Sequence, residues 1–153
     1  MYTPEKIYRS LIYFTTRIVP SGVTVVDGQE YGIRVDDPTG QVPSIAVTMG
    51  TTDNAALELG SFGTEYPATF VINAQSRLQR DALKYIVRSG LYNNDIAVYS
   101  MFDQFTPASG AVVEQMIGLG DYYQARDMPS FDSDRERFFW NSVITVAINV
   151  FGL

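Results

Sequence analysis

Apolar residues recur with a helical period at the start of the chain. Four of them fall on one stripe, and four polar or aromatic residues fall on the opposite side: Ile7, Leu11, Phe14 and Ile18 against Lys6, Arg9, Tyr13 and Arg17. Thr3, Pro4 and Glu5 suit a helix start, because they supply a hydroxyl N-cap, a proline for the first turn and an acid near the positive end of the dipole. Pro20 and Gly22 then end the element. The pattern predicts an amphipathic helix of about four turns.

Short apolar runs and turn signals follow this helix. Val23–Val35 is typical of a β-hairpin with Asp27-Gly28 as its turn, and Asp36–Gly40 predicts a second turn. We expect a strand over Val42–Met49, where alternate residues share an apolar face. Gly50–Gly63 is small and polar, which predicts a long projecting loop. Three apolar residues of that loop could pack inward or meet a partner: Leu57, Leu59 and Phe62.

A strand and a helix with one basic edge occupy the middle of the chain. Ala68, Phe70 and Ile72 alternate with their neighbours and predict the strand. The helix places two sets of residues on opposite sides: Leu78, Ala82, Tyr85 and Ile86 against Arg77, Arg80, Lys84 and Arg88. Gly90 is a natural C-cap, and a further strand begins at Ile96. The connection is long enough for a crossover between parallel strands, and a mixed sheet is equally compatible.

The C-terminal part ends in a long strand. Phe102–Gly110 predicts a loop, Val112–Gly118 a short strand and Asp121–Asp134 a polar, turn-rich segment. In the last element one set of alternate residues is apolar: Phe138, Trp140, Ile144, Val146, Ile148 and Val150. These elements predict an α/β (α+β) fold with a mixed or mostly antiparallel sheet, two main helices and long projecting loops. No boundary or repeat divides the chain, so we expect residues 1–153 to form a single domain.

Composition places the chain among globular proteins. Its 153 residues are 46% hydrophobic and 18% charged, which suits a fold that buries about two thirds of the unfolded surface. No apolar run approaches the ~20 residues that cross a bilayer, and the N-terminus lacks the basic-then-apolar order of a secretory signal. We therefore expect no membrane partner. The lack of cysteine excludes disulfides and is compatible with a reducing compartment.

The charge balance bears on the class of partner. Eleven basic residues against seventeen acidic ones give a net charge of −6. This disfavours nucleic-acid binding over the whole surface, because duplex binding needs many contacts between Lys or Arg and phosphate. Lysine occurs only at Lys6 and Lys84, so arginine supplies most of the positive charge. Since arginine suits forked contacts across protein interfaces, the composition favours a protein partner.

Residues for catalysis are scarce in this sequence. Histidine and cysteine are both absent, so Ser/His/Asp and Cys/His nucleophiles cannot form, nor can zinc sites built on those ligands. There is no Walker loop, and Gly118-Leu119-Gly120 lacks the third glycine of a dinucleotide fingerprint. We therefore expect no catalytic residue, no cofactor and no metal. The residues favour a structural or binding protein over an enzyme.

Two acidic groups keep an enzyme open as a remote alternative. The first is the alternating set Asp132, Asp134 and Glu136. These acids could hold a divalent cation in a carboxylate enzyme, but Arg137 and Val143 stand where an EF-hand loop has its glycine and its closing glutamate. A solvated loop is the plainer interpretation. The second group, Asp36-Asp37, is more typical of a turn than of an acid–base pair.

The basic side of the central helix has three interpretations. It could be an exposed face with Asp81 as partial partner, a contact to the acidic surface of a neighbouring copy, or a phosphate-binding stripe, which the net charge disfavours. A small-ligand or peptide-binding module is a further alternative, with Leu57–Phe62 lining its pocket. The candidate residues for an interface with another subunit or with a partner protein are Leu57, Leu59, Phe62, Arg77, Arg80, Lys84 and Arg88.

Several segments resemble the tail terminator and neck proteins of long-tailed bacteriophages. They are the opening helix PEKIYRSLIYFTTRIV, the phrase ALELG at Ala56–Gly60, the strand–helix unit ATFVINAQSRLQRDALKYIVRSGL and the closing strand RERFFWNSVITVAINV. The resemblance covers most of the chain. Val23–Gly40 and Asp121–Asp134 match nothing in that pattern.

The resemblance implies a sheet with helices packed on one side, and copies that form a homohexamer ring on the end of the tail tube. In that family the ring stops tube growth and gives the head–tail connector protein a surface to dock on. The resemblance implies no catalytic or cofactor residues, and it places the protein in the virion after assembly in the host cytoplasm. Genomic DNA would pass through the ring without specific binding, repelled by any acidic lining. The alternative is a head-closure or tail-completion protein of the same neck region.

Overall fold

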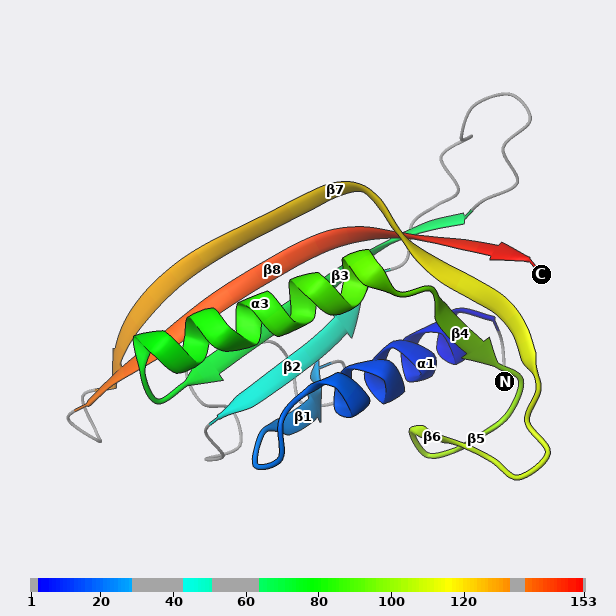
Figure 1. Cartoon of the computed structure of the whole chain (residues 1–153), viewed down its shortest axis with the longest axis horizontal. Coiled ribbons are helices and arrows are strands. Elements are labelled where there is room, and N and C mark those ends of the chain that lie inside the picture. Colours follow the sequence, from blue (N-terminus) through cyan, green and yellow to red (C-terminus); the bar gives the residue numbers. More distant parts are fainter. Residues whose placement is uncertain (1–2, 29–42, 51–63, 133–136, 153) are drawn as a thin grey trace.

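The structure, a computed structural model, describes residues 3–28, 43–50, 64–132 and 137–152. These residues form the following helices and strands: α1 Thr3–Ile18, β1 Thr24–Asp27, β2 Ser44–Met49, β3 Thr64–Ala74, α3 Arg77–Asn93, β4 Ile96–Tyr99, β5 Phe102–Asp103, β6 Thr106–Pro107, β7 Val113–Asp132 and β8 Arg137–Gly152. The predicted α+β fold is confirmed, with a mixed, mostly antiparallel sheet (Figure 1).

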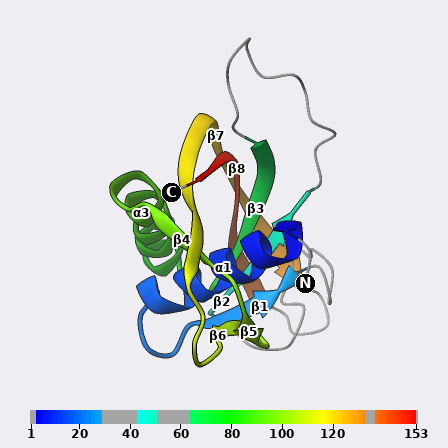
Figure 2. The ribbon, with the colours of Figure 1, turned by 90° about the vertical axis from the view of Figure 1, so that its right-hand side faces the viewer.

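The main sheet has the strand order β1-β2-β3-β8-β7-β4 within the described residues. β1 runs parallel to β2, and each of the other neighbouring pairs in this sheet is antiparallel. β3 and β4 therefore point in opposite directions, so α3 joins them without a parallel crossover. Figure 2 shows from the side that α3 stands against one face of the sheet. The helices share that face: α3 packs on β3, β8 and β7, and α1 on β4, β1 and β2.

The core lies between the two helices and this face of the sheet. Helix α1 matches its predicted span and buries Ile7 and Leu11 of the predicted stripe completely. The sheet side chains that pack into the same cluster include Ile45, Val47, Phe70, Ile72, Ile144, Val146 and Ile148. Burial of one such side chain contributes about 1.5–3 kcal/mol. The alternation predicted for the last strand is therefore confirmed at its central residues.

Helix α3 buries a different side from the two that the sequence distinguished. Its core face carries Leu83, Val87 and Leu91, whereas Leu78 and Tyr85 point to solvent. Residues four apart lie on one helix face, so these three aliphatic residues form a stripe that can be buried without a polar group. A buried Tyr85 would have needed a hydrogen-bond partner for its hydroxyl.

Gly90 is not the C-cap that the sequence predicted. α3 continues to Asn93, and the side-chain amide of the cap residue Asn94 donates to the Gly90 carbonyl oxygen at 3.0 Å. A Cβ at position 90 would lie 2.7 Å from Ile18 Cδ1. The glycine therefore allows α1 and α3 to approach each other closely.

β7 is much longer than the sequence predicted. A short strand was expected over Val112–Gly118 and a loop over Asp121–Asp134, but β7 extends to Asp132 and pairs with β8 over most of that length. Polar residues fit because β4 pairs with β7 only over Val113–Ile117, so among the described residues the rest of β7 lies at the sheet edge, where Gln124, Arg126 and Asp127 are exposed. The register shifts between Leu119 and Tyr123, and such a bulge interrupts the alternation by which a strand is recognised.

Two further expectations are corrected in part. The loop predicted over Phe102–Gly110 contains the β5–β6 hairpin, whose turn residue Gln104 has φ +57°. Within the hairpin predicted over Val23–Val35, β1 pairs in parallel with β2 instead. The expected second arm of that hairpin lies outside the described residues, as do the turn at Asp36–Gly40 and most of the loop at Gly50–Gly63.

Candidate assembly surface

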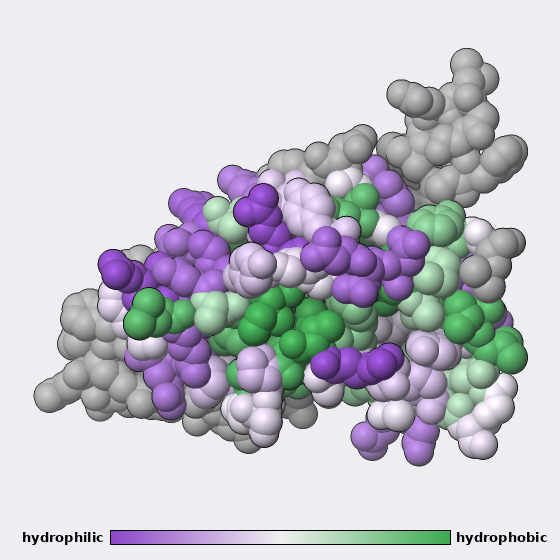
Figure 3. Space-filling view, in the orientation of Figure 1, coloured by the Kyte–Doolittle hydropathy of each residue, from purple (hydrophilic) through white to green (hydrophobic). Residues whose placement is uncertain are grey.

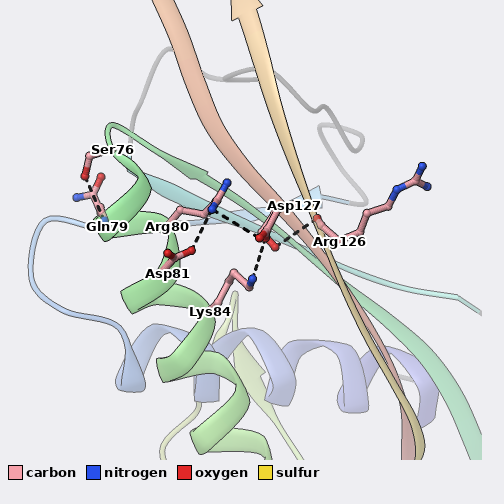
Figure 4. Close-up of polar contacts among 8 residues, drawn as sticks. Ser76, Gln79, Arg80, Asp81, Lys84, Arg126 and Asp127 are labelled. Carbon is pink, nitrogen blue, oxygen red and sulfur yellow. Dashed lines mark hydrogen bonds and ion pairs between the residues drawn. The ribbon is translucent and has the colours of Figure 1, made fainter.

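Two of the four predicted interface cations form ion pairs within the molecule. Arg80 is only 7% exposed, its Nε lies 3.1 Å from Asp81 Oδ1, and its guanidinium stands 5.5 Å from the Trp140 ring centroid. Lys84 Nζ donates to Asp127 Oδ1 at 2.8 Å, and Arg80 Nη2 lies 3.5 Å from Asp127 Oδ2 (Figure 4). These contacts join α3 to β7. The continuous exposed stripe expected from the sequence is thus broken at Arg80.

The N-terminus of α3 lies one turn before Arg80, the first residue of this ion-pair cluster. Ser76 has extended backbone angles and its hydroxyl oxygen accepts from the Gln79 backbone N–H at 3.1 Å, which is an N-cap. Gln79 returns a contact, because its side-chain oxygen accepts from the Gln75 N–H at 2.8 Å. This reciprocal capping fixes the first turn of α3 and so the position from which Arg80 reaches β7.

The ion pairs with Lys84 and Arg80 affect the pKa of Asp127. Burial alone would raise the pKa of this carboxyl, but hydrogen bonds from Lys84 and Ser142 and the charges of Lys84 and Arg80 outweigh burial. The pKa therefore lies below its ordinary value. The carboxylate is held charged, which agrees with a structural ion pair.

Arg77 and Arg88 remain exposed on α3. The Arg88 guanidinium lies 5.5 Å from the Tyr92 ring centroid and 5.6 Å from that of Tyr123 on β7. Burial raises the pKa of the Tyr123 hydroxyl, although the Arg88 charge opposes the change. Tyrosine and arginine are the residue types enriched at the energetic centres of protein interfaces.

The outer face of α3 is apolar and open. Leu78 is 77% exposed, Tyr85 72% and Tyr92 56%, and Ala82 is exposed between them. Leu78, Ala82 and Tyr85 lie three or four positions apart and Tyr92 lies two turns further on, so the four residues form one row opposite the core face. We call this row the α3 outer face. Sequence reasoning found Leu78, Ala82 and Tyr85 as a group but did not place them on the surface.

A hollow adjoins the α3 outer face. It has a volume of about 310 Å³, is open to solvent, and is lined from α3 by Ala82, Leu83 and Ile86 and from the segment after α1 by residues that include Pro20 and Val23. Figure 3 shows apolar residues gathered between α1 and α3 on this side of the molecule. A second open hollow of about 320 Å³ lies between α1 and β4, lined by polar and aromatic side chains.

A second exposed apolar spot lies beside the β5–β6 hairpin. Met101 is 46% exposed and Val112 61%. Both flank Ser100, whose backbone N–H donates to the Val112 carbonyl oxygen at 2.9 Å. Asp103 and Glu114 are exposed close by in the chain, although Glu114 also pairs with Lys6 at 3.1 Å. We call Met101, Val112 and Asp103 the hairpin end, because Met101 and Val112 lie beside the open end of the hairpin and Asp103 lies within it, in β5.

The hairpin is held in place by α1. The Arg9 guanidinium donates to the Gln104 carbonyl oxygen at the turn and lies 5.3 Å from the Phe105 ring centroid. Glu5 in turn accepts from Arg9 Nε at 2.8 Å. The projecting hairpin end is therefore positioned before any partner binds, which lowers the entropic cost of binding.

Other sequence candidates lie outside the described residues. These are Leu57, Leu59 and Phe62, and also Asp134 and Glu136 of the acidic set, so the proposed carboxylate site stays untested. Across the part of the chain that the structure describes, no three His, Cys, Asp or Glu residues gather as metal ligands would. In that same part, none of the helices has the length and apolar character needed to cross a membrane.

Neither the protein-family models nor the curated proteins contain a match to the sequence of this chain.

Proposed function

We propose that this protein is a structural virion protein, a tail terminator whose copies form a homohexamer ring. The ring caps the tail tube and joins it to the head–tail connector protein. In this role the protein catalyses no reaction and uses no cofactor and no metal. The protein would assemble in the host cytoplasm and remain in the tail and neck of the virion.

The observation that carries the proposal is the α3 outer face. Leu78, Tyr85 and Tyr92 are more than half exposed, whereas Leu83, Val87 and Leu91 on the opposite side of α3 are buried. Contiguous exposed apolar surface of this kind marks a protein interaction site. Three of the four segments that resemble tail terminators fall mainly in α1, β3–α3 and β8, whereas Ala56–Gly60 lies outside the described residues.

The proposed mechanism is steric and cooperative. A cyclic ring repeats one head-to-tail contact, so a contact that is weak between two copies acts several times in the closed assembly. A bound ring covers the end of the tube and leaves no site for the next tube subunit. Genomic DNA passes through the ring, and a net negative subunit gives it no strong attraction.

Electron microscopy of particles that lack the protein tests the proposal. Overlong tails without a regular end are expected if the protein is the terminator. Tails of normal length that fail to join heads would instead identify the alternative, a head-closure or tail-completion protein. Normal particles would contradict both. Light scattering after size-exclusion chromatography on the purified chain, alone and with tail tubes, tests the ring itself.

A further inference from the structure

We infer that the ring contact joins two different surfaces of this chain: the hairpin end of one copy docks on the α3 outer face and its adjoining hollow on the next copy. The inference rests on the proposed function and names the surfaces that it requires. Because the two surfaces are different, the contact is heterologous. Such contacts build rings or open chains, whereas one self-complementary surface stops at a dimer.

The accepting surface combines an apolar row with a cavity. Ala82 belongs to both, since it lies in the α3 outer face and lines the hollow of about 310 Å³. Leu78 and Tyr85 lie one helical turn from Ala82 in the same row and are 77% and 72% exposed. Interface energy concentrates where a side chain fills a pocket surrounded by residues that exclude water. The hollow offers that pocket.

The donating surface has side chains of suitable size on a fixed support. Met101 and Val112 are exposed at the base of the β5–β6 hairpin, which projects from the body at the lower right in Figure 1. Methionine adapts its shape to irregular hollows. The Arg9 contacts at Gln104 and Phe105 hold the hairpin, so little freedom is lost on docking.

Charge favours a second copy of this chain as the occupant. Helix α3 carries four cations and one carboxylate, a surplus of three positive charges: Arg77, Arg80, Lys84 and Arg88 against Asp81. The whole chain has a net charge of −6, so the remaining residues carry nine excess negative charges. Asp103 at the hairpin end is one of these. Opposite charges on the two surfaces favour the correct pairing and oppose contact between like surfaces.

The size of the α3 outer face sets the strength of a single contact. A 17-residue helix is ~25 Å long and presents a face ~10 Å wide, or roughly 250 Å². A stable interface buries about 800 Å² per partner. Even with the hollow added, one contact is small, so the assembly depends on ring closure or on the tube as a template.

A mixing experiment with two double variants tests the inference. Leu78→Glu/Tyr85→Glu removes the accepting surface, and Met101→Glu/Val112→Glu removes the donating surface. All four side chains are substantially exposed, so both variants should fold, which circular dichroism and thermal unfolding check. Thr16→Glu adds the same side chain at an exposed α1 position away from both surfaces and is the control. Sedimentation velocity measures assembly, and cross-linking on purified tail tubes repeats it on the template.

Each variant alone should stay monomeric, with association weakened by roughly ten-fold or more, while the control assembles as the wild type does. An equal mixture should form dimers and nothing larger, because it contains one intact accepting surface and one intact donating surface. Wild-type assembly by either variant, or a mixture that stays monomeric, overturns the inference and leaves the ring proposal standing. A wild-type chain that forms no oligomer, alone or on tubes, overturns both. Loss of tube binding without loss of self-association would assign the α3 outer face to the tube protein instead.

Discussion

The cations of α3 differ in what they contact, and this decides which of them can meet a partner. Arg80 and Lys84 bind Asp127 on β7, whereas Arg77 and Arg88 stay exposed. A buried charge that loses its partner is costly, so Arg80 and Asp127 hold the helix on the sheet. At the residue scale, the sequence grouped these four cations on one side of the helix. The sequence could not show which cations are paired and which are exposed, because their partner Asp127 lies 47 residues beyond Arg80 in a segment predicted to be a loop.

Asp127 gives a prediction about pH. Its pKa is lowered in the folded protein, so its contribution to stability is complete above the unfolded carboxyl pKa of about 3.9 and is lost as the pH falls through the folded value. Asp127→Asn should therefore be less stable than wild type at pH 7, and the difference should shrink below pH ~4. Because the carboxylate is 38% exposed, we expect no more than about 1 kcal/mol. Urea unfolding at several pH values measures it.

Lys84→Met supplies the control for this prediction. It removes the ammonium group that donates to Asp127 Oδ1 at 2.8 Å, so the Asp127→Asn difference should be smaller in the Lys84→Met background. A wild-type advantage that stays constant between pH 7 and pH 3 would show that the carboxylate charge is not what stabilises the contact.

At the scale of elements, periodic segments were predictable and edge segments were not. α1 was found because its apolar stripe is unbroken, and β8 because alternate residues such as Ile144 and Ile148 are fully buried. The end of β7 was missed because an edge strand keeps polar side chains on its surface and because its bulge shifts the register. The sequence did not predict which face of α3 is buried, because the amphipathic pattern of the helix is compatible with more than one buried face. Packing against the sheet and α1 buries the face that carries Leu83.

The bulge in β7 gives a prediction about Gly120. A Cβ there would lie 2.8 Å from the Ala147 carbonyl oxygen, which is backbone of β8 and cannot move aside as a side chain can. Gly120→Ala should therefore destabilise the protein by about 1–3 kcal/mol. Gly152→Ala is the matched control on β8, since nothing lies within 4 Å of its Cβ position. Thermal unfolding compares the two, and equal melting temperatures would mean that the strands separate at the bulge without cost.

At the scale of the whole molecule, charge and apolar surface act in opposite directions. The net charge of −6 keeps copies apart by repulsion, while the uneven distribution of that charge lets one orientation attract. The apolar residues of the α3 outer face add attraction only after the surfaces meet. Because salt screens the electrostatic attraction and leaves the apolar contact in place, the response of assembly to salt can be predicted.

Sodium chloride should weaken self-association of the wild-type chain. Raising it from 0.1 M to 1 M shortens the screening length from about 10 Å to 3 Å, which removes the attraction between Arg77 or Arg88 and the acidic hairpin end. Exposed pairs contribute up to about 1 kcal/mol each, so the dissociation constant should rise by roughly three- to ten-fold. Sedimentation equilibrium measures this change. Arg77→Gln/Arg88→Gln should associate more weakly at 0.1 M and respond less to salt, because its attraction is already reduced. Association that strengthens with sodium chloride would indicate that repulsion between copies outweighs the attraction of the two surfaces, and that apolar contact alone selects the partner.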